Sequence, residues 1–105
     1  MISSDSIRGF NDIIILGILK EAPSYGYGIS KKISDRTDKN YVIKETTLYS
    51  AFKRLEISGY ISSFSDRREN GKLRTYYKLT DKGAKYYEDK RAEWHLIKKV
   101  IDKFI

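Results

Sequence analysis

The stretch ENGKLRTYYKLTDKG, residues 69–83, decides the fold of this chain. Its Asn70-Gly71 pair favours a two-residue type I′ turn, because both central positions of that turn need a positive φ that Asn and Gly tolerate. Thr80 is a good helix N-cap, and Asp81 suits a first helical turn. The stretch therefore predicts a tight β-hairpin that leads directly into a helix. Its flanking charges are mostly basic: Arg67, Arg68, Lys72, Arg74 and Lys78 against Asp66 and Glu69.

The strands of this hairpin are predicted at residues 60–65 and 73–79, after a helix that Gly59 ends. On the second strand, Thr75, Tyr77 and Leu79 share one face. The other face carries Arg74, Tyr76 and Lys78. This alternation predicts a ribbon that packs on one face only.

Upstream, residues 7–21 read as a helix whose apolar side chains surround the cylinder instead of forming one stripe. Such a helix needs cover on two sides. We expect the second cover to be another subunit, and a helix central to a monomer is the alternative. The apolar positions are Ile7, Phe10, Ile13, Ile14, Ile15, Leu16, Ile18 and Leu19.

A second helix is predicted over about residues 25–34, after a break at Pro23. Ile29 and Ile33 are expected to face inwards. Of the two tyrosines that open this helix, we expect Tyr27 to pack and Tyr25 to lie where a phenol and free helix amides can contact phosphate. Residues 35–40 are predicted to form a loop, and residues 41–43 a short strand or extended connector.

A third helix over about residues 45–58 is predicted to have two different faces. Four apolar side chains recur at helical spacing on the face that packs: Leu48, Ala51, Phe52 and Leu55. The opposite face and its flanks carry polar and basic side chains: Thr46, Tyr49, Ser50, Lys53 and Arg54. One face of this helix is therefore free to contact another molecule.

The last helix is predicted from Thr80 to near the C-terminus, with a seam of large apolar side chains. Such a seam serves either coiled-coil dimerisation or packing on the domain's own core. The seam residues are Tyr87, Trp94, Ile97, Ile101 and Phe104, with Val100 beside them.

The 105 residues suffice for one domain, and the net charge of +7 is concentrated in the middle of the chain. Residues 31–78 hold twelve basic and six acidic side chains, a net of +6. A basic middle suits a face that binds a polyanion, and a solubilising surface is the alternative. No membrane-spanning run and no export signal are visible, so we expect a cytoplasmic protein.

Catalysis and metal binding are not expected. The chain has no cysteine, and no pair of nucleophile and base or phosphate-cradling glycine loop is apparent. His95 is the only histidine and is expected at the surface. We therefore predict neither an enzyme nor a bound cofactor or metal.

Three helices followed by a basic hairpin are the order of a winged helix-turn-helix, in which the third helix enters the DNA major groove and the hairpin reaches phosphates. We therefore predict a mainly α fold with a small antiparallel β-hairpin. Residues 1–79 form the DNA-binding domain, and residues 80–105 form a C-terminal dimerisation helix packed on it. The predicted DNA-binding residues are Tyr25, Thr46, Tyr49, Ser50, Lys53, Arg54, Arg68, Gly71, Lys72 and Arg74.

Three stretches also resemble the PadR-like family of transcriptional regulators: LGILKEAPSYGYGI at 16–29, ETTLYSAFKRLEISGYI at 45–61 and RTYYKLTDKG at 74–83. The resemblance implies a homodimeric winged-helix repressor that binds double-stranded DNA at a pseudo-palindromic operator. It also implies dimerisation through the first and last helices, in the short form with a single C-terminal helix. Ser50 and Phe52 depart from the family's usual Pro and Leu. Phe52 is still apolar and faces the core, but Ser50 lies on the exposed face, so operator preference cannot be carried over.

In multidrug-binding members that this chain resembles, a Trp of the last helix stacks on flat hydrophobic ligands at the dimer centre. Trp94 occupies a comparable place, so the resemblance implies a small hydrophobic or aromatic effector there; an anchor in the dimer interface is the alternative. The candidate dimerisation or effector residues are Phe10, Ile14, Ile18, Trp94, Ile97, Ile101 and Phe104. The other class of function weighed is a winged-helix module that binds proteins and not DNA, which the basic third-helix face disfavours.

Overall fold

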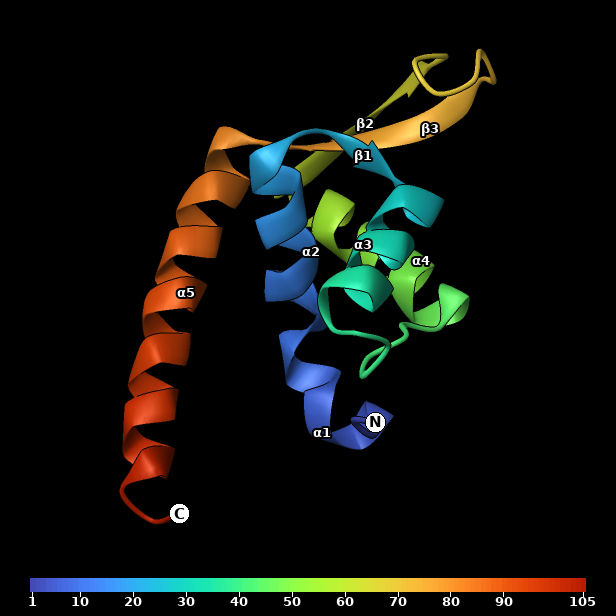
Figure 1. Cartoon of the computed structure of the whole chain (residues 1–105). Helices are drawn as coiled ribbons and strands as arrows, with labels where there is room; N and C mark the ends of the chain where they lie inside the picture. The colour runs from blue at the N-terminus through green and yellow to red at the C-terminus, as the bar shows by residue number, and fades with distance from the viewer.

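The computed structural model describes residues 1–105 and confirms the predicted fold class: mainly helical, with one small antiparallel sheet (Figure 1). The N-terminal part comprises α1 (Ser4–Ile7), the 3-10 turn η1 (Arg8–Phe10) and α2 (Asn11–Glu21). The middle comprises β1 (Ser24–Tyr25), α3 (Gly26–Arg36) and α4 (Glu45–Ile57). The wing strands β2 (Ile61–Asp66) and β3 (Arg74–Leu79) precede the long helix α5 (Asp81–Asp102). This is the arrangement of a winged helix-turn-helix.

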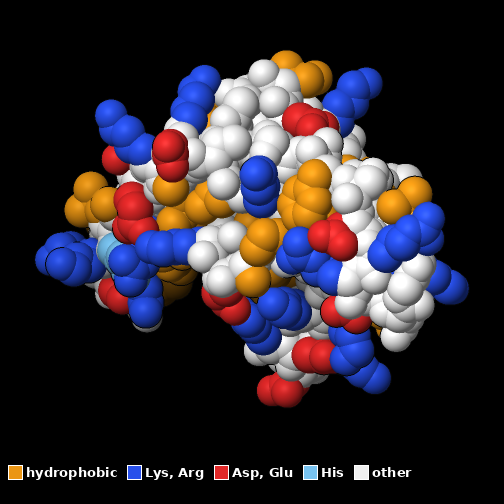
Figure 2. All heavy atoms as spheres, turned by 90° about the horizontal axis from the view of Figure 1, so that it is seen from above, with side chains coloured by type: hydrophobic (Ala, Val, Ile, Leu, Met, Phe, Trp, Pro, Cys, Tyr) orange, Lys and Arg blue, Asp and Glu red, His pale blue; other side chains and the backbone are white.

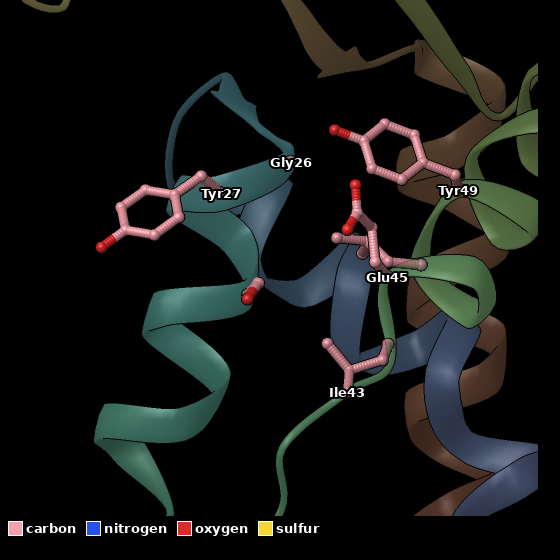
Figure 3. A pocket seen from close by; sticks show the side chains of 7 residues that line it. Gly26, Tyr27, Ile43, Glu45 and Tyr49 are labelled. Atoms are coloured by element: carbon pink, nitrogen blue, oxygen red, sulfur yellow. The ribbon is translucent and has the colours of Figure 1, made fainter.

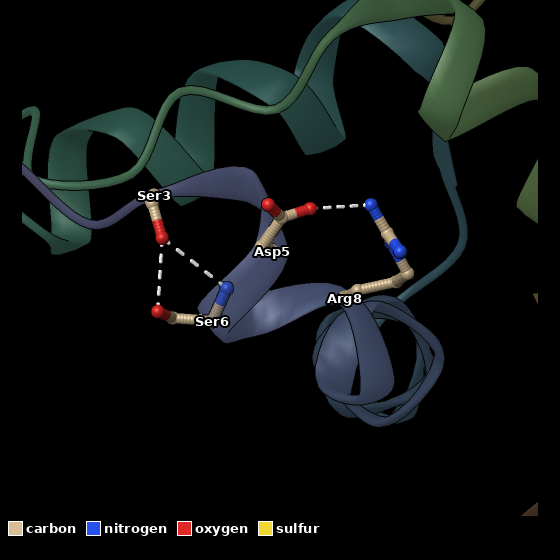
Figure 4. A network of polar contacts seen from close by, with 4 residues as sticks. All are labelled: Ser3, Asp5, Ser6 and Arg8. Carbon is tan, nitrogen blue, oxygen red and sulfur yellow. Dashed lines mark hydrogen bonds and ion pairs between the residues drawn. The ribbon is translucent and has the colours of Figure 1, made fainter.

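The predicted first helix is interrupted, because residues 8–10 form a 3-10 turn between α1 and α2. Gly9 lies in this turn and has open space where a side chain would be. Ser3 caps α1 by accepting the Ser6 amide at 3.3 Å, and Arg8 pairs with Asp5 at 2.5 Å (Figure 4). The chain therefore turns before α2 begins, which the apolar pattern alone did not indicate.

One side of α2 is covered by α5 of the same chain. Figure 1 shows α5 running alongside α2, with α3 and α4 on the other side of α2 and the sheet across the top of the helices. Gly17 allows the close approach, since a Cβ there would lie 3.3 Å from the Tyr87 ring. The buried α2 residues are Asn11, Ile15, Leu16, Ile18 and Leu19.

The sheet has three strands in the order β1-β3-β2, so the wing hairpin carries an additional two-residue strand that was not predicted. The predicted turn is present: Asn70 and Gly71 have φ of 55° and 68°, and the Lys72 amide donates to the Glu69 carbonyl. The ladder, however, ends at the Asp66–Arg74 pair. The wing tip is therefore a seven-residue loop, 67–73, one residue later than the gap 66–72 between the predicted strands, and the Asn70-Gly71 turn lies within it.

The prediction that the wing packs on one face only is wrong at Tyr76, which is 2% exposed. Tyr76 pairs with Tyr25 across β1 and with Phe64 across β2, so three aromatic rings lie in a row on one face of the sheet. Their ring centroids are 5.3 and 5.7 Å apart. The opposite face packs as predicted, with Tyr77 stacked on Phe52 at 4.1 Å. Both faces of the wing base are therefore covered.

Other predictions of packing are mostly confirmed. Leu48, Ala51, Phe52 and Leu55 of α4 are each at most 2% exposed, and Ile29 and Ile33 of α3 are buried. Residues 41–43 are an extended connector without strand pairing, and Tyr41 and Ile43 are buried there. The expected packing of Tyr27 is wrong: it is 65% exposed, and Tyr25 is the one that packs.

Thr80 caps α5 as predicted, accepting the Gly83 amide at 3.0 Å. The C-terminal half of α5 extends along the molecule with much of its apolar surface uncovered. None of the helices combines the length and apolar character that spanning a bilayer would require.

Candidate nucleic-acid interface

The exposed face of α4 presents short polar side chains and one free cation. Thr46, Ser50 and Lys53 are exposed as predicted, and Lys53 makes no ion pair. Arg54 is in a different situation, because its guanidinium pairs with Asp12 of α2. Arg54 is therefore held against the body of the domain, whereas Lys53 is available to an incoming anion.

The N-terminal segment adds polar groups beside α4 that were not predicted as part of the interface. Arg8 and Asn11 line a shallow groove of about 310 Å³ together with Thr46, Ser50 and Arg54. Asn11 is itself occupied, since its Oδ1 accepts from the Tyr41 hydroxyl. No pattern in the sequence placed Arg8 here, because its position depends on the 3-10 turn.

The wing cations differ in how firmly they are neutralised. Arg68 pairs with Asp66 at 2.9 Å, and this bond is the main cause that holds the pKa of the Asp66 carboxyl below its ordinary value. Arg74 and Lys72 make no ion pair; the Arg74 guanidinium lies 4.5 Å from the centre of the Tyr25 ring. The wing therefore offers Arg74 and Lys72 as uncompensated charges.

Gly71 stands at the tip of the wing, with no atom within 4 Å of where a Cβ would be. Its φ of 68° favours glycine, and the missing side chain leaves the tip thin. A hydrogen bond within the wing loop holds the tip, because the Arg67 guanidinium donates to the Gly71 carbonyl at 3.3 Å.

The wing and α3 together enclose a groove of about 460 Å³. Four predicted DNA-binding residues from three elements and the wing loop meet here: Tyr25, Tyr49, Lys72 and Arg74. Tyr27, Gly26, Thr75 and Tyr77 complete the lining. Phenols and cations around one groove can donate several hydrogen bonds to a phosphate.

Acidic side chains accompany many of the cations on the surface. Viewed from above, Lys and Arg side chains are spread over the molecule, several of them beside Asp or Glu, with hydrophobic side chains between them (Figure 2). The ion pairs agree with this picture: Arg36 with Glu21, Lys31 with Asp35, and Lys20 with Glu88. The total of 21 Lys and Arg side chains is thus an overestimate of the cations that are free to bind.

The candidate dimerisation and effector residues divide into a group that packs around Trp94 and a group that is exposed near the C-terminus. Trp94 is 39% exposed and contacts Phe10 edge-to-face, with ring centroids 5.1 Å apart. It lines an apolar groove of about 470 Å³ together with Ile14 and Ile18, although Ile18 is only 4% exposed. Ile97 is half-buried beside Phe10 and Trp94, whereas Ile101 and Phe104 are 47% and 82% exposed.

Groups for catalysis or metal binding do not gather at these grooves. No cluster of three or more His, Asp or Glu side chains could hold a metal ion, and His95 is exposed as expected.

Comparisons with known proteins place this geometry among characterised folds. The sequence pattern of the Transcriptional regulator PadR-like family matches residues 15–89. A transcriptional regulator from Clostridium thermocellum is similar over 100% of this chain and 99% of its own, with 59% identity and a TM-score of 0.90. A PadR family transcription regulator from Clostridium difficile is 39% identical over 89% of this chain and 95% of its own, with a TM-score of 0.77.

A third structure, PadR from Bacillus subtilis in complex with operator DNA, has a TM-score of 0.65 and 24% identity. The match covers 74% of this chain and 45% of that one. At this identity the likeness extends to the fold alone.

Proposed function

Since the chain belongs to the PadR-like family of transcriptional regulators, we propose that it represses transcription by binding double-stranded DNA as a homodimer at a pseudo-palindromic operator. The observation that carries the proposal is the surface that α4 and the wing form together. An exposed helix face with hydroxyls and Lys53 lies beside a wing with Arg74 and Lys72 uncompensated. The relative from Bacillus subtilis bound to operator DNA adds support from a distant member.

Each part of the surface has a distinct role in this proposal. Thr46, Tyr49 and Ser50 face the base edges in the major groove, where hydroxyls can donate or accept. Lys53, Lys72 and Arg74 neutralise phosphates and set the register. Residues 1–79 form the DNA-binding unit, and residues 80–105 hold the two subunits together.

The dimer is proposed from the apolar strip on the C-terminal half of α5. Leu96, Val100, Ile101 and Phe104 are 47–82% exposed, and apolar surface of this extent is stabilised by burial against a second copy. A two-fold axis between the subunits would place the two α4 helices in successive major grooves of one duplex. Because the two helices are then related by the same symmetry, the operator should be an inverted repeat.

An effector is proposed at Trp94. Trp94 lines a mainly apolar groove with Ile14 and Ile18, and its ring also contacts Phe10, which lines a smaller neighbouring groove. A flat hydrophobic or aromatic molecule could stack on the indole in the larger groove. A bound effector would change the packing of α5 against the second subunit. The two α4 helices would then no longer match the operator, and repression would be relieved. In line with this role we place the protein in the cytoplasm, where its DNA is.

The test is a selection from genomic fragments with purified protein at about 50 and about 200 mM salt. An enriched inverted repeat, with half-sites about one helical turn apart, supports the proposal. If two subunits neutralise about six to ten phosphates, affinity should fall by roughly 10³ to 10⁵ between these concentrations. A flat salt response, or no motif from a folded protein, refutes DNA binding by this surface and favours a protein partner.

A further inference from the structure

Glu45 is an exposed carboxylate without a partner at the start of α4. Of the two acidic residues on this helix, Glu56 accepts a hydrogen bond from the Ser63 hydroxyl at 2.7 Å, whereas Glu45 has neither a hydrogen bond nor an ion pair. Lys53, on the same helix, is likewise unpaired. The molecule itself therefore does not use the acceptor capacity of Glu45.

The surroundings of Glu45 form a small cleft between α3 and α4, with a volume of about 210 Å³. Figure 3 shows the carboxylate rising beside the ring of Tyr49, with Ile43 below it and Tyr27 turned outwards on the opposite wall. Tyr49 and Tyr27 are 48% and 65% exposed. Glu45 therefore lies in a recess, beside the phenol of Tyr49, on the face that we assign to DNA.

A carboxylate on a DNA-facing surface is unfavourable unless it meets a donor. It is repelled by the phosphates and loses water on binding. The donors that a duplex offers in the major groove are the exocyclic amino groups of cytosine, N4, and of adenine, N6. In helix-turn-helix proteins the N-terminal residues of the recognition helix contact base edges, and Glu45 is the first residue of α4.

We propose that Glu45 is a specificity-determining residue that accepts a hydrogen bond from the exocyclic amino group of one base in each half-site, with cytosine N4 as the main donor. The proposal rests on the proposed function, because it assigns a role within the same interface. Glu45 then excludes guanine and thymine at that position, since their major-groove acceptors would face a second acceptor. Thr46 and Ser50 can adapt their hydroxyls to donors or acceptors, whereas an ionised Glu45 cannot.

The competing explanation is that Glu45 only stabilises the N-terminus of α4. An acidic side chain in a first helical turn is favourable there, and Lys44, the N-cap residue, makes no side-chain cap. Such a role would affect the stability of the fold, and it would affect binding to every DNA sequence equally. Base preference at one position separates the two explanations.

The experiment is the genomic selection repeated with Glu45→Gln, with Glu56→Gln as the matched control. Gln keeps the length of Glu and removes its charge, but its amide can donate as well as accept, so it suits adenine. We expect the parent to prefer one base at one position of each half-site by about tenfold or more. In Glu45→Gln that preference should disappear or move to adenine while the other positions stay unchanged, and Glu56→Gln should keep the parent motif.

An unchanged motif in Glu45→Gln overturns the proposal, whether affinity rises uniformly from lost repulsion or falls with a lower Tm. A loss of preference in Glu45→Gln that is equal at every position of the half-site overturns it as well. These failures leave the proposed function standing, because the parent still enriches an inverted repeat. If the parent enriches no motif at all, the proposed function and the role of Glu45 are refuted together.

Discussion

The hydroxyl of Tyr49 occupies the space in front of Gly26: a Cβ atom built on Gly26 would lie 2.3 Å from Tyr49 Oη and 2.9 Å from its Cζ. The ring also contacts Phe52 edge-to-face at 5.4 Å. The first residue of α3 thus has no side chain, so that a side chain of α4 can lie across it. Gly26 and Tyr49 together set the position of a phenol on the proposed DNA face.

Gly26→Ala should therefore impair operator binding more than folding. The new methyl group must push the Tyr49 ring outwards, while alanine gains roughly 1 kcal/mol over glycine as a helix former. We expect a free energy of unfolding within about 1 kcal/mol of the parent and a loss of operator affinity of about tenfold. Chemical unfolding and a binding titration measure the two quantities.

A double-mutant cycle identifies the cause. In a Tyr49→Ala background the clash is absent, so Gly26→Ala should cost no further affinity. An equal loss in both backgrounds would show that Gly26 acts on DNA binding through something other than Tyr49.

Lys53→Ala and Arg74→Ala test the two unpaired cations of the interface. Each should weaken operator binding and lower the slope of log affinity against log salt by about 2, because each removes one phosphate contact from each of the two subunits. Lys85→Ala, an exposed change of the same charge on α5, is the control and should retain the parent slope. If both interface variants keep the parent affinity and slope, this surface does not bind the DNA backbone.

Which features of the fold the sequence predicted depends on how far apart in sequence the interacting residues lie. The faces of α4, the Asn70-Gly71 turn and the Thr80 cap are local, set by helical spacing and by the φ preferences of single residues, and all three were predicted correctly. β1 was missed because two residues give no periodic signal; only pairing with Tyr76 and Tyr77 makes them a strand.

The errors at the site have the same origin. Assigning Tyr27 to the core was wrong, because the packing of these tyrosines depends on Tyr25 joining the aromatic row across the sheet. The availability of Arg54 depends on Asp12, which is 42 residues away in sequence. Net charge cannot indicate which cations a tertiary ion pair has neutralised.

Tyr76→Phe should leave the fold as stable as the parent or stabilise it by up to about 1 kcal/mol. The Tyr76 hydroxyl is buried and has no hydrogen-bond partner, and an unsatisfied buried hydroxyl costs free energy that phenylalanine avoids. Tyr76→Ala, which also deletes the ring between Tyr25 and Phe64, should cost about 3 to 5 kcal/mol. Urea unfolding distinguishes these outcomes, and a loss above 1 kcal/mol in Tyr76→Phe would mean that the hydroxyl has a partner.

Alkaline pH should destabilise the fold through its buried phenols. Burial raises the pKa of Tyr41, Tyr76 and Tyr77 above the ordinary value, and for Tyr41 the hydrogen bond to Asn11 offsets part of the rise. A group whose folded pKa is raised stabilises the fold fully below its unfolded pKa, near 10, and loses that contribution as pH rises through the folded pKa.

Phenolate absorbance during a pH titration should therefore show late-ionising tyrosines whose ionisation coincides with loss of helical circular dichroism. Tyr76→Phe should remove one of them. Ionisation of all nine tyrosines near pH 10 with the helices intact would contradict this expectation.

Ile101→Glu should convert the proposed dimer into a folded monomer. Ile101 is 47% exposed on the uncovered strip of α5, and in a two-fold dimer each substitution places a charge in the interface twice. Losing the burial of two isoleucine side chains, at about 1.5 to 3 kcal/mol each, should weaken association by well over tenfold. Ile57→Glu is the control, because Ile57 is 77% exposed at the end of α4, away from the strip. Sedimentation equilibrium gives the association constant and far-UV circular dichroism the fold. A parent that is monomeric, or an Ile57 variant that dissociates equally, would exclude this strip as the dimer interface.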